Sequence, residues 1–244
     1  MRVVSLVPSV TETLVAWGVQ PVAVTRFCQQ PQLQSVGGTK NPHIARIVAL
    51  APDVVIVDKE ENRAEDATAL EEAGIGLHVT HVTSLVDVGP VMAGLARLLG
   101  RTEADGPSLP PIPPIPSIPP IPPIQTVPAA GLARLNAFIP IWRRPWMSIN
   151  AATYGSSLLA AAGIDNIFSG AAERYPAVTL EEASARRPDI VLAPSEPFPF
   201  GERHRGELTP VAPVVLVDGQ DLFWWGVRTA GALRRLSALR VAAR

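Results

Sequence analysis

Residues 47–61 read IVALAPDVVIVDKEE, which is the end of a predicted helix, a Pro-Asp turn, an apolar strand and a loop that carries glutamate. Residues 184–197, SARRPDIVLAPSEP, follow the same scheme. Aligning the two Pro-Asp pairs places Glu60 opposite Glu196, each beyond the carboxyl end of a strand. Open α/β sheets place their binding loops at this end. A Pro-Asp turn before a strand is common in β-α units and does not by itself indicate a repeat. The matching positions of Glu60 and Glu196 are what indicate one.

The stretches around these two segments continue the alternation of short strands and helices. In the first part of the chain, strands are predicted at 3–7, 21–25, 53–58 and 77–82, and helices at 11–17, 44–50, 64–73 and 85–99. In the last part, strands are predicted at 134–141, 189–193 and 214–217, and helices at 154–162, 180–186 and 226–241. Ser9 or Thr11 is the expected N-cap of the first helix.

Short β-α units of this kind imply mostly parallel sheets covered by helices. We therefore predict an α/β protein with two β-α lobes, an N-terminal lobe over 1–104 and a C-terminal lobe over 132–244. Two such lobes in one chain suggest a ligand cleft between them.

The segment that joins the lobes, 105–131, is unusually rich in proline. Eleven of the 26 prolines fall between Pro107 and Pro128. Large apolar side chains recur there at every third position, at Leu109, Ile112, Ile115, Ile118, Ile121, Ile124 and Val127. Because polyproline II has three residues per turn, these side chains would share one face. We predict a rigid polyproline II connector whose apolar face packs on the lobes, in preference to a flexible linker or an SH3-type ligand.

The overall composition excludes several classes of protein. The chain has 244 residues and a formal net charge of −1, so it offers no basic face for nucleic acid. The single cysteine, Cys28, excludes a disulfide framework and a multi-cysteine metal site. No apolar run approaches the ~20 residues of a membrane span, and the strand-like start predicts no secretory signal in this chain. We expect a monomer, and the sequence leaves its location open between the cytoplasm, for the chain as it stands, and the outside of the cytoplasmic membrane.

The catalytic signatures are absent from the sequence: it contains no G-x-S-x-G elbow, P-loop or H-E-x-x-H motif. Cys28 is more simply a bystander than a nucleophile. His78 and His81 lie three positions apart in a predicted strand, so they face opposite sides and cannot share a metal. His204, in the loop-like stretch GERHRGE, is the histidine that we consider as a metal ligand.

The large aromatic residues gather in loops that follow predicted strands. Trp142 and Trp146 bracket two arginines in IWRRPWMS, and Phe198 lies in SEPFPFGERH. Trp224 and Trp225 precede the closing helix, and Phe27 follows the second strand. We expect some of these aromatic side chains to pack into the local hydrophobic core. The remainder predicts large flat faces with a few arginines, which suit a bulky, partly apolar ligand with polar or anionic edges.

Several stretches resemble the class III, helical-backbone substrate-binding proteins of ABC importers, in their vitamin B12-binding and metal-chelate branch. They are RVVSLVPSVTETLVAWG, VAVTRFCQQP, VGGTKNPHIARIVALAPDVVIV and RYPAVTLEEASARRPDIVLAPSEPFPF, and the similarity spans all but 105–131. The resemblance implies two α/β lobes joined by one rigid backbone helix, with a ligand between them. It also implies one surface glutamate per lobe that docks on an ABC permease.

Carried over onto this sequence, the resemblance implies a set of ligand-binding residues from both lobes. They are Ser9, Thr11, Phe27, Lys40, Glu60 (or Glu61), Trp142, Arg143, Trp146, Tyr154, Glu196, Phe198, Trp224 and Trp225. The chain departs from the family pattern in two places. The proline segment stands where relatives carry the backbone helix. At the positions of the two docking glutamates, this chain has Ala64 and the region of Phe223 and Trp224, and Glu65 could take the place of the first glutamate.

The leading hypothesis is a non-enzymatic binding protein for cobalamin, another corrinoid, or a related chelate such as haem or a ferric siderophore. No intrinsic cofactor is expected. The rival hypothesis is a cytoplasmic enzyme or chaperone that acts on a metal chelate through His204, Cys28 and Glu196.

Overall fold

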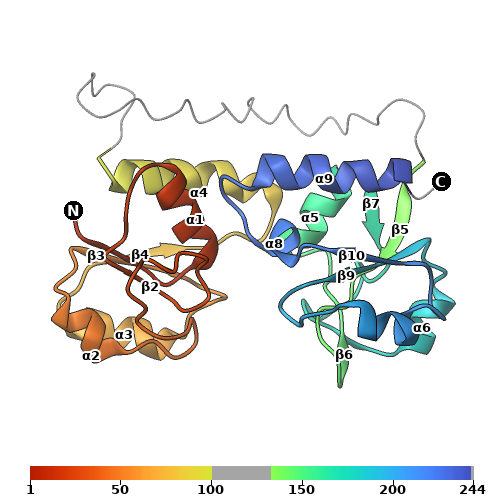
Figure 1. Ribbon diagram of the computed structural model, residues 1–244, viewed down its shortest axis with the longest axis horizontal. Coiled ribbons are helices and arrows are strands. Elements are labelled where there is room, and N and C mark those ends of the chain that lie inside the picture. Colours follow the sequence, from red (N-terminus) through yellow and green to blue (C-terminus); the bar gives the residue numbers. More distant parts are fainter. Residues whose placement is uncertain (101–132, 243–244) are drawn as a thin grey trace. The chain divides into compact units, whose positions relative to one another are not determined.

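The computed structural model describes residues 1–100 and 133–242 (Figure 1). The predicted connector at 105–131 lies outside these residues. The described chain forms two compact units. The first comprises residues 1–82, 86–100 and 225–227, and the second comprises 83–85, 133–224 and 228–242. Within the described ranges, every helix is too short or too polar to cross a membrane.

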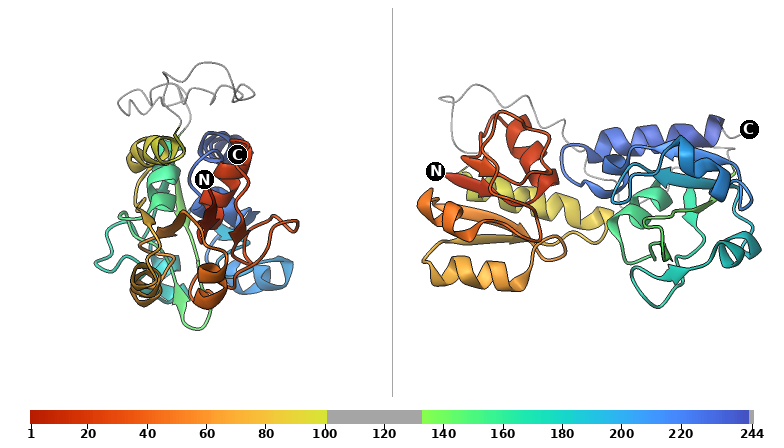
Figure 2. Two further views of the ribbon diagram at one scale, coloured as in Figure 1. Left: turned by 90° about the vertical axis from the view of Figure 1, so that its left-hand side faces the viewer. Right: turned by 60° about the horizontal axis from the view of Figure 1, so that its bottom comes forward.

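The first unit is a four-stranded parallel sheet in the order β2-β1-β3-β4. Its strands are β1 (Val3–Ser5), β2 (Ala23–Val24), β3 (Val54–Asp58) and β4 (Leu77–Thr80), and its helices are α1 (Pro8–Ala16), α2 (Ile44–Ala49), α3 (Ala64–Glu72) and α4 (Leu85–Leu98). Helices α2 and α3 lie on one side of the sheet, and α1 and α4 on the other (Figures 1 and 2). Val4 and Val55 of the sheet share a core with Ile47 of α2 and Leu70 of α3.

The second unit contains a parallel sheet in the order β10-β9-β5-β7 and a small antiparallel pair, β6-β8. Its strands are β5 (Leu135–Phe138), β6 (Trp146–Met147), β7 (Ile164–Asn166), β8 (Ala177–Val178), β9 (Ile190–Pro194) and β10 (Val214–Val217). Its helices are α5 (Tyr154–Ala161), α6 (Leu180–Ala185), α7 (Arg205–Leu208), α8 (Gly219–Phe223) and α9 (Thr229–Ala242), with a 3₁₀ turn at Glu202–His204.

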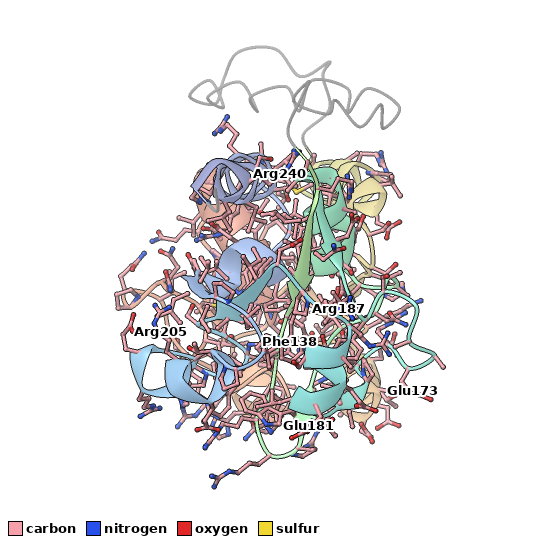
Figure 3. The ribbon with its side chains drawn as sticks, turned by 90° about the vertical axis from the view of Figure 1, so that its right-hand side faces the viewer. Phe138, Glu173, Glu181, Arg187, Arg205 and Arg240 are labelled. Carbon is pink, nitrogen blue, oxygen red and sulfur yellow. The ribbon has the colours of Figure 1, made fainter. Side chains whose placement is uncertain are left out.

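One core of the second unit joins its sheet to α6 and α7. Phe138 and Val191 of the sheet pack with Ala183 of α6 and Leu208 of α7. Phe138 lies in the interior of the unit, whereas Glu173, Glu181 and Arg205 lie at its periphery (Figure 3). The α/β architecture with parallel sheets that the sequence predicts is confirmed.

The two units repeat one topology. Taken from β7 to β10, the second sheet reads β7-β5-β9-β10, which matches β2-β1-β3-β4 strand for strand. The Pro-Asp turns match as well: Asp53 accepts a hydrogen bond from the Arg2 backbone N–H (2.5 Å), and Asp189 accepts one from the Asn136 N–H (2.6 Å). The residues before the two prolines, Ala51 and Arg187, both have positive φ, 42° and 50°.

Helix starts follow local capping chemistry. At α6, Thr179 accepts from the Glu182 N–H while the Glu182 carboxylate accepts from the Thr179 N–H, which is a capping box. The prediction that Ser9 or Thr11 caps the first helix is wrong. That helix begins at Pro8 after Val7, because the fixed φ of proline suits the first helical position.

Candidate ligand-binding site

Five ring-bearing residues of the second unit form one group, which we call the aromatic cluster: Trp142, Trp146, Phe198, Phe200 and His204. The ring centroids of Trp142 and Phe198 lie 5.7 Å apart, edge to face. Trp146 stacks on Phe200 at 6.0 Å with an interplanar angle of 7°. Phe198 and Phe200 are 4.7 Å apart, and the imidazole of His204 lies 5.3 Å and 5.6 Å from them. Loops distant in sequence thus converge on one aromatic surface.

The cluster lies at the carboxyl ends of two paired strands, β5 and β9. In the first unit, only residues 6–7 separate β1 from α1, whereas residues 139–153 separate the matching β5 from α5. This longer connection carries both tryptophans of the cluster. It folds back on itself, because Met147 donates its N–H to the Trp142 carbonyl, and it pairs through β6 with β8. The site therefore depends on an insertion specific to the second unit.

The cluster members differ in their exposure. Phe200 and His204 are buried, Trp146 and Phe198 are half-buried, and Trp142 is 45% exposed. An exposed indole that rests edge to face on a second ring keeps its own face available for stacking. Trp142 is the most exposed ring of the cluster.

Arg143 does not point its charge to solvent. Its guanidinium forms two hydrogen bonds to the Glu207 carboxylate of α7, at 2.9 Å and 2.6 Å. These hydrogen bonds, chiefly, hold the pKa of Glu207 below its usual range, and the charge of Arg144 adds to the effect. The ion pair ties the insertion to α7, and Glu207 is a site residue that the sequence analysis missed, because nothing in sequence links positions so far apart.

His204 is enclosed by its neighbours. Its Nδ1 atom accepts a hydrogen bond from the Gly201 N–H (3.1 Å), and Nε of Arg203 lies 3.2 Å from its Nε2. Burial, followed by the charges of Arg203 and Arg143, lowers the pKa of this imidazole. The described residues contain no group of three His, Cys, Asp or Glu side chains that could hold a metal ion. The assignment of His204 as a metal ligand stays a prediction.

Glu196 and Trp224 meet beside the cluster loops. Burial raises the pKa of the Glu196 carboxyl, while a hydrogen bond from Trp224 opposes the shift. A Cβ atom on Gly219 would lie 2.5 Å from the Glu196 backbone nitrogen, so only glycine allows this close approach. Trp224 is 8% exposed, and the guanidinium of Arg228 lies 5.7 Å from its ring centroid.

The two remaining predicted residues from the last part of the chain are also buried. The hydroxyl of Tyr154 shares a hydrogen bond with Thr229 (3.0 Å), and burial raises its pKa to about 12. Trp225 is 4% exposed and belongs to the first unit. Among the predicted aromatic residues, Trp142 is thus exposed, whereas Tyr154, Trp224 and Trp225 are buried.

The predicted residues of the first unit follow the carboxyl ends of β1, β2 and β3. Ser9 is buried, and its hydroxyl has no hydrogen-bond partner among the described residues. Thr11 is engaged internally, because its hydroxyl donates to Ser5 and accepts from the Cys28 thiol. Phe27 is 51% exposed, with the guanidinium of Arg26 5.0 Å from its ring centroid.

The loop after β3 is held by Asp58, a residue that the sequence analysis did not select. The Asp58 carboxylate accepts hydrogen bonds from Thr80 (2.8 Å) and from the Glu60 N–H (2.9 Å). Burial raises its pKa, and hydrogen bonds from Thr80 and from the Glu61 backbone oppose the shift. Lys40 donates to the Glu60 carbonyl, so the two predicted residues Lys40 and Glu60 lie together in the first unit.

Comparison with known proteins identifies similar chains. A family model described as "Periplasmic binding protein" matches residues 3–101. The vitamin B12-binding protein of Pectobacterium carotovorum subsp. carotovorum is 26% identical over 202 residues, which is 80% of this chain and 72% of the relative. That of Vibrio vulnificus is 24% identical over 197 residues, 78% of this chain and 70% of the relative.

Two solved structures have the same fold along nearly the whole chain. The periplasmic vitamin B12 binding protein BtuF of Vibrio cholerae matches with a TM-score of 0.79 and 19% identity, covering 99% of this chain and 97% of the other. The periplasmic heme-binding protein RhuT from Roseiflexus sp. RS-1 in apo form matches with a TM-score of 0.76 and 20% identity, covering 99% and 98%.

Proposed function

We propose that this chain is a class III substrate-binding protein of the ABC-importer type and that it binds a metal-chelate macrocycle without enzymatic activity. Cobalamin, another corrinoid and haem are the candidate ligands, because similar proteins are named for vitamin B12 and for haem. A ferric siderophore is a less direct candidate. The proposal treats the chelate as a transported ligand and an ABC permease as the partner.

The observation that carries the proposal is the exposed indole of Trp142, backed by Phe198 at the end of the parallel sheet. Stacking a flat macrocycle on such a face buries apolar area on both partners. The ligand contacts that the sequence predicts in the first unit, Ser9, Thr11, Phe27, Lys40 and Glu60, remain part of the proposal.

The rival hypothesis of an enzyme or chaperone gains no support from these observations. The relatives are named as binding proteins. Cys28, one of the three residues invoked for chemistry, is hydrogen-bonded to Thr11 and Thr25 in the first unit. We therefore keep a single proposed function.

Titration of the full chain with cyanocobalamin, iron(III) protoporphyrin IX and ferrichrome tests the proposal. We expect at least one of them to quench tryptophan fluorescence and to bind with a Kd in the micromolar range or tighter. Trp142→Ala should weaken that binding about fivefold, because a stacking contact contributes on the order of 1 kcal/mol.

Tyr175→Ala is the matched control, since Tyr175 is a similarly exposed aromatic residue of the same unit outside the cluster. Its affinity should equal that of the wild type. The proposal fails if no chelate binds below millimolar concentration. Equal affinity of Trp142→Ala and wild type would remove Trp142 from the site.

A further inference from the structure

The surroundings of the aromatic cluster carry more positive than negative charge. Arg143, Arg144 and Arg203 lie in its two loops, and the pKa of Glu207 responds to Arg143 and Arg144. Burial is the main cause of the lowered pKa of His204, and the nearby charges of Arg203 and Arg143 add to it. The carboxylates near these arginines are Glu196 and Glu202 of the second loop and Glu207 of α7. Both oxygens of Glu207 accept hydrogen bonds from Arg143, and Glu202 pairs with Arg205.

Arg144 differs from the other arginines around the cluster. Arg143 is paired with Glu207, Arg203 lies against His204, and Arg205 forms a bidentate pair with Glu202. Arg144 is exposed, and it has no hydrogen bond or ion pair within the described residues. It lies in the turn between Trp142 and Trp146, so its side chain starts from the middle of the insertion that carries both tryptophans.

The backbone of Arg144 is also unusual. Its φ of 67° lies in the left-handed region, which residues with a side chain seldom adopt. Among the described residues, the two other non-glycine residues with positive φ are Ala51 and Arg187, which directly precede the prolines of the repeated Pro-Asp turns, and Arg144 likewise precedes a proline, Pro145. The turn at Arg144 has no counterpart in the first unit, where the connection after β1 is only residues 6–7.

We propose that Arg144 binds a carboxylate at the edge of the ligand stacked on Trp142, and that this site therefore selects an anionic chelate over a neutral one. This inference rests on the proposed function. A guanidinium pairs with a carboxylate through two parallel hydrogen bonds, and the pair strengthens where an aromatic surface excludes water. A macrocycle with carboxylate side chains can satisfy Arg144 and stack on the indole at the same time, whereas an esterified macrocycle of equal size can only stack.

The test uses two ligands that differ only in these carboxylates: iron(III) protoporphyrin IX and its dimethyl ester. Wild type should bind the diacid more tightly than the ester. Arg144→Gln should weaken binding of the diacid about tenfold to a hundredfold, since hydrogen bonds to charged groups contribute on this scale. The same variant should leave the affinity for the ester unchanged.

Two further variants serve as matched controls. Arg234→Gln removes the same charge from an exposed position on α9, and it should change neither affinity. Arg143→Gln breaks the ion pair with Glu207 and loosens the insertion, so it should weaken the diacid and the ester alike. A loss of affinity for the diacid alone indicates direct recognition by the substituted arginine. An equal loss for the diacid and the ester indicates that the arginine supports the loop.

The outcomes distinguish the inference from the function on which it rests. If wild type binds the diacid but Arg144→Gln binds it equally well, or weakens the ester to the same degree, the inference is wrong and the proposed function stands. Binding of cyanocobalamin without binding of the diacid has the same meaning. If none of these ligands binds, the proposed function fails and the inference fails with it.

Discussion

Single side chains in the second unit bear charges that its fold depends on. Asp221 of α8 is 7% exposed and accepts hydrogen bonds from Arg235 at 2.5 Å and 2.6 Å and from Arg228 at 3.2 Å. Burial opposes ionisation of this carboxyl, but the hydrogen bonds from Arg235 and Arg228 prevail, so its pKa is lowered. The ion pair between Asp221 and Arg235 connects α8 to α9.

Asp221→Asn should reduce the free energy of unfolding by about 2 kcal/mol at neutral pH, less than for a fully buried pair because Arg235 is more than half exposed. A lowered folded-state pKa stabilises the protein above the unfolded value of about 3.9. That contribution is lost as the pH falls through the folded-state pKa. Urea unfolding of both proteins at neutral pH and near pH 3 should therefore show a smaller difference in acid. An equal difference at both pH values would contradict this assignment.

The packing of α9 on the second unit depends on one close contact at the end of α5. Gly163 follows this helix with a φ of 82°, and a Cβ atom there would lie 2.4–2.8 Å from the guanidinium of Arg240. Arg240 is buried and donates to the Ala133 carbonyl. Glycine thus meets two demands at this position, a left-handed backbone and room for an arginine from α9.

Gly163→Ala should destabilise the protein by about 2 kcal/mol, through backbone strain and displacement of Arg240. Two other glycines separate these causes. Gly74 has a similar φ of 78° with nothing within 4 Å, so Gly74→Ala should cost about 1 kcal/mol from strain alone. Gly170, in open space without a positive φ, should tolerate alanine. Thermal unfolding of the three variants gives the ranking, and equal effects at Gly163 and Gly74 would exclude a role for the Arg240 contact.

Across the whole molecule, each unit has a hydrophobic core of its own. The core between the first sheet and its helices α2 and α3 includes Ile47 and Leu70, and that of the second unit includes Phe138 and Phe168, whose rings meet edge to face at 5.8 Å. A unit with its own core can unfold as a separate cooperative block.

Phe138→Ala should lower the stability of the second unit by about 3–5 kcal/mol, since it removes a fully buried ring. Calorimetry of this variant should resolve an early transition of the second unit from a later one of the first. A single transition that shifts as a whole would show that the two cores unfold together.

Local patterns in the sequence determined the α/β architecture and the strand ends that its loops follow. The Pro-Asp repeat, short apolar strands and helix stops predict two units of parallel sheet, because backbone hydrogen bonding and burial act over a few residues. The same reasoning placed Trp142, Trp146 and Phe198 in loops after strands. It missed the short strands β6, β7 and β8, which are too brief to show a periodic pattern and form only when a partner strand is present.

Only the tertiary structure decided which of these residues meet and which remain accessible. Phe200 and His204 join Trp142 in one cluster, while Trp224, Trp225 and Tyr154 are buried. Arg143 pairs with Glu207 of α7, and Arg144 beside it stays exposed, although the two arginines are equivalent in sequence. The reason is physical: exposure and charge pairing depend on groups that approach through space, and the order of residues along a chain does not encode those distances locally.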